Sequence, residues 1–276
     1  MTLPHRNLTD SPEGDTASAA PPHRAPVRWR AAGDLLVAFA ALLGIGTVTR
    51  SALGLPAAYS VVLVGGYGVL ATLLIAFLPV HLPRPGIGWA NRVTLFRATL
   101  TLPVAALVLV PGMVEGPAAW WVIGLGAAAS VLDGVDGWLA RVTDTHTPFG
   151  ARFDMELDAF LILALSALVW TSTPIGPWVL GIGLIRYAFV LAGRLLPHLE
   201  APLPPSVRRK AVCVIQTVAL LVALGPPVPT VLAVTSAALA LAALVYSFTV
   251  DLRWLHRHRP SRRPTRDPTT GRHGSG

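Results

Sequence analysis

Apolar residues dominate this chain in eight long runs, and short polar, proline-containing or glycine-containing connections separate them. The runs are residues 31–48, 58–80, 93–110, 118–132, 157–170, 178–196, 211–224 and 229–250. Several are shorter than the roughly 20 residues that a helix needs to cross a bilayer, but each can extend through glycine, threonine or a terminal charge. The pattern predicts an all-α integral membrane protein with about eight transmembrane helices.

Composition supports a membrane protein independently of the pattern. Hydrophobic residues make up 53% of the 276 residues and charged residues only 13%, whereas soluble domains have roughly 25% charged residues. The net charge of +8 would suit a nucleic-acid-binding protein, but the basic residues are spread over connections and tails. We therefore expect them to contact anionic lipid headgroups, and we expect no nucleic-acid partner.

The basic residues also predict how the chain is oriented in the membrane. They precede the first run, follow the last one and otherwise gather in alternate connections: Arg24, Arg28, Arg30, Arg84, Arg92, Arg141, Arg152, Arg194, Arg208, Arg209, Lys210, Arg253, Arg257, Arg259 and Arg262. The opposite connections carry little beyond Arg50 and Glu115. By the positive-inside rule both termini are cytoplasmic, and the expected location is the inner (cell) membrane of a bacterium.

One polar stretch, DGVDGWLARVTDTHTPFGARFDMELD, stands out from these apolar surroundings. On a helix that advances about 100° per residue, its first half places two carboxylates beside two near-absent side chains within an arc of roughly 100°. These residues are Asp133, Asp136, Gly137 and Ala140. Such a face has room for a cation and a bulky ligand.

The second half of the stretch predicts another polar face. After a loop expected at Thr147 and Pro148, a ladder of Gly150, Asp154 and Asp158 recurs every four residues along the next helix. If the two faces meet, their oxygens suit Mg²⁺ or Mn²⁺, hard cations that also bind phosphates. Carboxylates in or near a membrane are costly unless paired or cation-bound, so this stretch, which opens to the cytoplasm, is the candidate site.

These residues resemble a known family. The positions Asp133, Asp136, Gly137, Ala140, Arg141, Gly150, Asp154 and Asp158 match the signature of the CDP-alcohol phosphotransferases (CDP-alcohol phosphatidyltransferases), integral membrane enzymes of phospholipid synthesis. Asn91, Thr94 and Arg97 resemble the family's upstream Asn/Thr/Arg segment, and Ser206, Lys210 and Gln216 its later Ser/Lys/Gln segment. The resemblance covers about residues 88 to 250.

The resemblance implies a fold and a division of the chain. A six-helix core at residues 86–255 is expected, preceded by an extra transmembrane hairpin at residues 29–85 that has no counterpart in the family core. Residues 1–28 and 256–276 are rich in proline, polar and charged residues, and we expect disordered cytoplasmic tails there.

The resemblance also implies a reaction. Family members transfer a substituted phosphate from a CDP-linked lipid to the hydroxyl of a second alcohol and release CMP. Two metal ions on Asp133, Asp136, Asp154 and Asp158 would neutralise the diphosphate, and Asp158 would be the general base. The expected nucleotide-binding residues are Gly137, Ala140, Arg141, Gly150, Asn91 and Thr94. Asn91 and Thr94 would equally well cap the third helix.

The acceptor is less well defined by these residues. CDP-diacylglycerol is the expected donor and glycerol 3-phosphate the leading acceptor, with inositol phosphate or another alcohol, or a CDP-alcohol plus diacylglycerol, as alternatives. Members that use phosphorylated acceptors commonly carry a basic residue just after the last aspartate, where this chain has Ala159. Other basic side chains would then bind the phosphate of the acceptor, and the candidates are Arg152, Arg186, Arg194 and Lys210.

Two other classes of function stay open. Intramembrane carboxylates also serve cation-coupled or proton-coupled transporters, although a transporter leaves Gly137, Ala140, Arg141 and Gly150 unexplained. A catalytically inactive membrane scaffold is the other class, but all four aspartates are intact. Gly65, Gly66 and Gly68 in the extra hairpin would permit close helix approach, either between two copies in a homodimer or within one chain.

Overall fold

The protein is a bundle of eight α-helices over the part of the chain that the structure describes. The computed structural model describes residues 27–77, 89–142, 147–195, 204 and 206–257, and the side chains of 27–30, 89–90, 136 and 138–142 fall outside that description. The helices are α1 (Val27–Leu53), α2 (Ala57–Phe77), α3 (Trp89–Leu107), α4 (Pro117–Val142), α5 (Pro148–Ser172), α6 (Leu180–Leu195), α7 (Val207–Ala223) and α8 (Thr230–Arg257), with a short 3₁₀ helix at Pro177–Val179. This confirms the predicted all-α fold.

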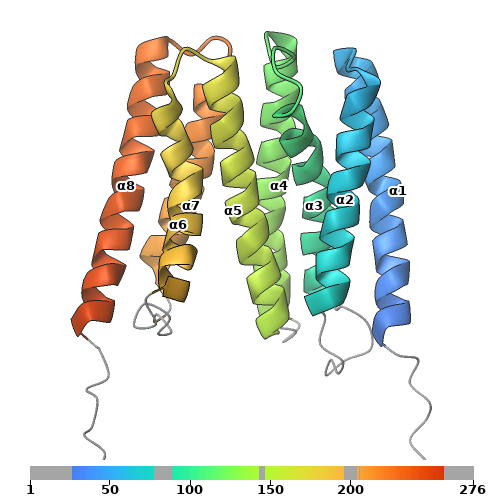
Figure 1. Cartoon of the computed structure of the whole chain (residues 1–276), viewed down its shortest axis with the longest axis horizontal. Helices are drawn as coiled ribbons and strands as arrows, with labels where there is room; N and C mark the ends of the chain where they lie inside the picture. The colour runs from blue at the N-terminus through green and yellow to red at the C-terminus, as the bar shows by residue number, and fades with distance from the viewer. Residues whose placement is uncertain (1–26, 78–88, 143–146, 196–203, 205, 258–276) are drawn as a thin grey trace, which may run out of the picture.

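The helices run side by side and alternate in direction (Figure 1). The starts of α1, α3, α5 and α7 and the ends of α2, α4, α6 and α8 therefore lie at one end of the bundle, which we call the site end. The tails expected at residues 1–28 and 256–276 fall outside the described residues, except that α1 begins at Val27 and α8 ends at Arg257.

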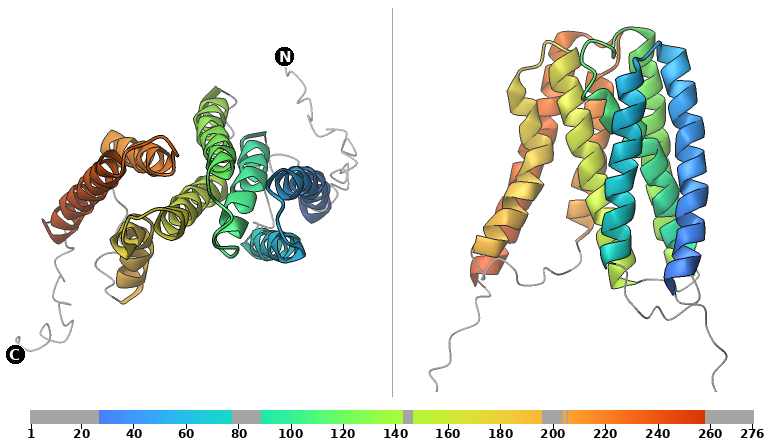
Figure 2. Two further views of the ribbon diagram at one scale, coloured as in Figure 1. Left: turned by 90° about the horizontal axis from the view of Figure 1, so that it is seen from above. Right: turned by 45° about the vertical axis from the view of Figure 1, so that its right-hand side comes forward.

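Seen along the helices, the bundle is elongated (Figure 2). The pair α1 and α2 lies at one edge, α7 and α8 lie at the other, and α3, α4 and α5 fill the middle. Helix α3 packs on α1, α4 and α5, and α5 packs on α6 and α7. Helices α4 and α5 carry the polar stretch between Asp133 and Asp158, and α3 carries Asn91, Thr94 and Arg97.

Five of the helices are long and apolar enough to cross a membrane, judged by length and composition. The candidate spans are Ala31–Leu53, Ala57–Phe77, Pro117–Val135, Pro177–Leu195 and Thr230–Arg257, the fourth of which includes the 3₁₀ helix before α6. The sequence predicted eight spans; the other three runs, in α3, α5 and α7, form helices whose first halves hold arginines, aspartates or lysine. The protein is thus an integral membrane protein, and α3, α5 and α7 carry charged residues in their first halves.

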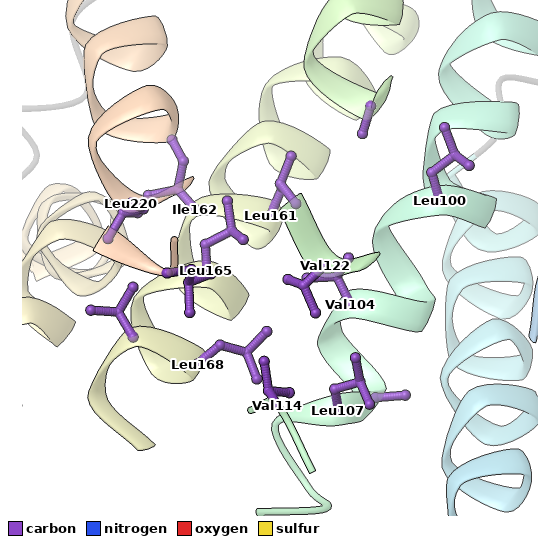
Figure 3. Close-up of a cluster of buried hydrophobic side chains, with 14 of the residues drawn as sticks. Leu100, Val104, Leu107, Val114, Val122, Leu161, Ile162, Leu165, Leu168 and Leu220 are labelled. Atoms are coloured by element: carbon purple, nitrogen blue, oxygen red, sulfur yellow. The ribbon is translucent and has the colours of Figure 1, made fainter. Parts of the chain in front are cut away.

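Buried apolar side chains join the central helices in one cluster (Figure 3). Val104 of α3, Val122 of α4, Leu165 of α5 and Leu220 of α7 are fully buried and belong to one hydrophobic cluster. A glycine brings two neighbouring helices closer still: a β-carbon on Gly183 of α6 would lie 2.6 Å from the Leu163 α-carbon of α5. Close packing of this kind stabilises helix pairs where lipid offers no hydrophobic drive.

Candidate active site

The start of α5 is built from its own sequence signals. Thr147 is the N-cap residue, and its hydroxyl oxygen accepts a hydrogen bond from the Gly150 backbone N–H at 3.0 Å. Pro148, which was expected in the connecting loop, is instead the first residue of the helix, a position where its missing N–H costs nothing. The cap starts the helix early enough to put Asp154 and Asp158 in its first three turns or so.

A buried arginine lies at the centre of the polar signature. The Arg97 side chain of α3 is only 1% exposed. Its Nε donates to the Ala129 carbonyl oxygen of α4 at 3.1 Å, which fixes the guanidinium between two helices. A buried guanidinium needs paired acceptors, so the groups around it are those that compensate its charge.

Three of the four signature aspartates meet on this guanidinium. Arg97 Nη1 donates to Asp154 and Nη2 donates to Asp158, both on α5. Nη1 also lies 3.0 Å from an Asp133 carboxylate oxygen on α4. One oxygen from each of these three carboxylates lies within 4.8 Å of the others. We call this set, Arg97 with Asp133, Asp154 and Asp158, the acid cluster.

The acid cluster keeps a negative charge that can be reached from outside. The three carboxylates carry −3 and Arg97 carries +1, which leaves −2 when Asp136, whose side chain lies outside the description, is left out. The carboxylates are 36%, 35% and 23% exposed, for Asp133, Asp154 and Asp158 respectively. Oxygen ligands, net negative charge and accessibility fit a hard divalent cation such as Mg²⁺ or Mn²⁺.

The expected nucleotide-binding residues divide into two groups. Asn91 and Thr94 of α3 are buried, as is Gly150 of α5, and a β-carbon on Gly150 would lie 2.2 Å from the Asn91 Oδ1. The structure thus brings Asn91 against Gly150. Gly137 is partly buried on α4, whereas Ala140 and Arg141 lie in α4 with side chains outside the description.

The basic side chains that are expected to bind an acceptor lie on different helices. Arg186 of α6 donates to Glu156 of α5 at 2.5 Å, and the buried Arg186 Nε has no hydrogen-bond partner among the described residues. Glu156 therefore pairs with α6 and does not join the acid cluster. Arg152, Arg194 and Lys210 are exposed, on α5, α6 and α7 respectively.

The sequence analysis named Arg97 only as part of the upstream Asn/Thr/Arg segment and did not include it among the site residues. The available signal was a charged residue inside the predicted third span, where a charge needs a partner. A buried acid was also missed: Asp251 of α8 is 2.5 Å from Arg208 Nη2 and 3.3 Å from Arg209 Nη1. These ion pairs, together with the bond from Gln216 Nε2 to the Ile182 carbonyl oxygen at 3.4 Å, tie α7 to its neighbours.

Comparison with known proteins identifies the core of the chain. The family model described as CDP-alcohol phosphatidyltransferase matches residues 88–248. This range contains α3 to α7, most of α8 and every residue of the acid cluster. No curated protein and no solved structure matches the chain.

Proposed function

Because the chain belongs to the CDP-alcohol phosphatidyltransferase family, we propose that it transfers a phosphatidyl group from CDP-diacylglycerol to a small alcohol and releases CMP. The family as a whole transfers a phosphate-containing group from a CDP-alcohol donor to an alcohol acceptor. Glycerol 3-phosphate is the proposed acceptor.

The observation that carries this proposal is the acid cluster. Asp154 and Asp158 follow Asp133 by 21 and 25 positions in the chain, yet single oxygens of the three carboxylates lie within 4.8 Å of one another. A group of like charges this close is unfavourable unless cations compensate it, and one guanidinium compensates only a third of it. Such a site suits a substrate that arrives with divalent cations on its diphosphate.

We propose that two Mg²⁺ or Mn²⁺ ions are held by Asp133, Asp136, Asp154 and Asp158. When bound, they would neutralise the diphosphate of the donor and the charge that develops on the departing CMP. Asp158 would accept the proton of the attacking hydroxyl. The bond that forms joins that hydroxyl oxygen to the phosphatidyl phosphorus, and the bond that breaks is the phosphoanhydride to CMP.

The proposed nucleotide pocket adjoins the acid cluster on α3, α4 and α5. Gly137 and Ala140 would leave room for the cytidine nucleotide, and Arg141 would contact its phosphates. Asn91, Thr94 and Gly150 would complete the pocket from the other two helices. The contact between Asn91 and Gly150 supports this part of the proposal, because it leaves the Asn91 amide next to a bare backbone.

For the acceptor, Arg186 is the first candidate among Arg152, Arg186, Arg194 and Lys210. Its contact with Glu156 puts it on the side of α6 that faces α5, and its Nε still offers a donor inside the protein. A phosphate would compete with Glu156 for its Nη2 group. Inositol phosphate satisfies the same chemistry and is the second candidate.

We further propose that the site end faces the cytoplasm. The arginines and lysine of α7, the Arg152 side chain and the last-turn Arg194 all lie at this end, as the positive-inside rule requires of the cytoplasmic side. We also propose that the chain divides into an extra hairpin, residues 29–85, and a catalytic core, residues 86–255. A homodimer is the proposed assembly.

The test is CMP release by the purified protein in detergent with Mg²⁺ and CDP-diacylglycerol. Glycerol 3-phosphate, inositol phosphate, serine and phosphatidylglycerol would be offered separately. We expect CMP with glycerol 3-phosphate, no CMP after chelation of Mg²⁺, and none from Asp154→Asn. Glu115→Gln removes an exposed acid at the opposite end of the bundle and should leave release unchanged.

Each result of this assay has a definite meaning. CMP with a different acceptor would replace glycerol 3-phosphate and keep the reaction. Full activity of Asp154→Asn would exclude the acid cluster as the site. If no acceptor gives CMP but vesicles that contain the protein take up a cation along a gradient across their membrane, the transporter hypothesis replaces the enzyme.

A further inference from the structure

We propose that Arg97 is a positioning residue of the cation site, which holds the three aspartates of the acid cluster together and sets the cluster's charge. The inference rests on the proposed function, because it concerns the same carboxylates. It goes further by assigning the geometry of the site to a residue that is neither a cation ligand nor a contact of either substrate.

The contacts of Arg97 reach three helices from one rigid group. The side chain starts on α3, its Nε donates to the α4 backbone at Ala129, and its two Nη groups contact Asp133 of α4 and both Asp154 and Asp158 of α5. A guanidinium is planar and presents five N–H donors in a fixed fork. Its orientation therefore dictates where the three carboxylates lie relative to one another.

The burial of Arg97 separates its role from that of the aspartates. At 1% exposure it lies behind carboxylates that are 23% to 36% exposed, so an incoming cation meets the carboxylates first. Each carboxylate has two oxygens and about four lone-pair positions, more than one guanidinium can occupy. Arg97 can therefore hold the acids from the inside while a cation binds them from the outside.

The charge of Arg97 gives a second reason for the assignment. Without it the three described carboxylates would carry −3 with their oxygens within 4.8 Å, and their repulsion would drive the α4 and α5 acids apart. With it the three described carboxylates and the guanidinium together carry −2, a charge that still attracts divalent cations. Hydrogen-bond partners of metal-ligating carboxylates typically contribute about 10- to 100-fold to metal affinity.

The experiment measures Mn²⁺ binding by electron paramagnetic resonance on the purified full-length protein in detergent. We expect Arg97→Gln to bind Mn²⁺ about 10- to 100-fold more weakly than the unmodified protein. Arg97→Lys keeps the charge but loses the fork, so it should recover part of the affinity. Arg92→Gln is the matched control, because it removes another α3 arginine that pairs with an acid, Asp34, outside the cluster.

The outcomes distinguish the inference from the proposed function. Unmodified protein that binds Mn²⁺, together with an Arg97→Gln variant of equal or tighter affinity, would overturn the inference and leave the enzyme intact. If Arg97→Gln does not fold, Arg97→Lys decides: reduced affinity supports the inference, and unchanged affinity overturns it. Equal losses in Arg92→Gln would show a general effect of destabilised α3 and would also overturn it. Unmodified protein that binds no Mn²⁺ and releases no CMP would overturn the proposed function itself.

Discussion

The Asn91 side-chain oxygen on α3 occupies the space where residue 150 of α5 would carry a β-carbon. The distance from that ideal β-carbon position to Asn91 Oδ1 is 2.2 Å, and the Thr147 hydroxyl oxygen lies 3.0 Å from the same point. Asn91 is buried, so its side chain cannot move into open space. A glycine at 150 is therefore required for α3 and α5 to approach at the site end.

Gly150→Ala should impair both packing and activity. The added methyl group would displace Asn91 and press on the Thr147 cap, at a cost of about 1–3 kcal/mol in the free energy of unfolding. We expect CMP release to fall by roughly tenfold or more, since about 1.4 kcal/mol in the barrier corresponds to tenfold. Gly124→Ala, on an open face of α4, is the control and should retain activity. A fully active Gly150→Ala enzyme would show that Asn91 is not needed where it lies.

A second glycine tests the contact between α5 and α6. A β-carbon on Gly183 would lie 2.6 Å from the Leu163 α-carbon, which belongs to the backbone and cannot rotate away. Gly183→Ala should thus separate the helices, lower the thermal unfolding temperature in detergent, and cost about 1–3 kcal/mol. Gly181→Ala is the matched control two residues earlier, where the nearest atom, of Leu241, is at an ordinary 3.6 Å. Equal unfolding temperatures for the two variants would contradict the prediction.

The course of α4 and α5 through the polar stretch could be predicted from the sequence. The apolar runs stop at residue 132 and resume at 157, but the spacing of Asp133, Asp136 and Ala140 and of Gly150, Asp154 and Asp158 predicted helix beyond both limits. Helix α4 does continue to Val142, and α5 begins at Pro148, within the expected loop. The backbone hydrogen bonds of a helix continue through charged residues when these find partners, as Asp133, Asp154 and Asp158 do.

In the site, contacts between residues close in the chain could be predicted from the sequence, whereas contacts between distant residues could not. The four-residue spacing of Asp154 and Asp158 predicted a shared helix face because that relationship is local. Arg97 meets these aspartates 57 and 61 positions later in the chain. No periodicity reports such a contact, which depends on how α3 packs against α4 and α5. The ion pairs of Asp34 and Asp251 escaped prediction for the same reason.

The ion pair between Asp34 and Arg92 should respond unequally to loss of its two members. It joins α1 of the extra hairpin to α3 at 2.9 Å, and the Asp34 side chain is 16% exposed against 42% for Arg92. Arg92→Gln leaves a mostly buried carboxylate without its cation, at a cost of about 1–3 kcal/mol. Asp34→Asn leaves an arginine that water can solvate, and it should cost less.

Thermal unfolding of both variants and of the double variant measures this difference. The double variant should be more stable than Arg92→Gln, because the second change removes the stranded charge. If Asp34→Asn is the more damaging single change, leaving Arg92 without Asp34 costs more than leaving the carboxylate without Arg92, and the prediction is wrong.

Arg186 should control the acceptor rather than the donor. Its Nη2 group donates to Glu156, and its buried Nε has no partner among the described residues, so the guanidinium can accommodate a phosphate without being rebuilt. A hydrogen bond to a charged group contributes about 1.5–3 kcal/mol. Arg186→Gln should therefore raise the KM for glycerol 3-phosphate by roughly tenfold or more and leave the KM for CDP-diacylglycerol unchanged. Parallel increases in both constants would instead mean that the loss of the Glu156 pair disturbs the whole site, and an unchanged acceptor KM would exclude Arg186 from acceptor binding.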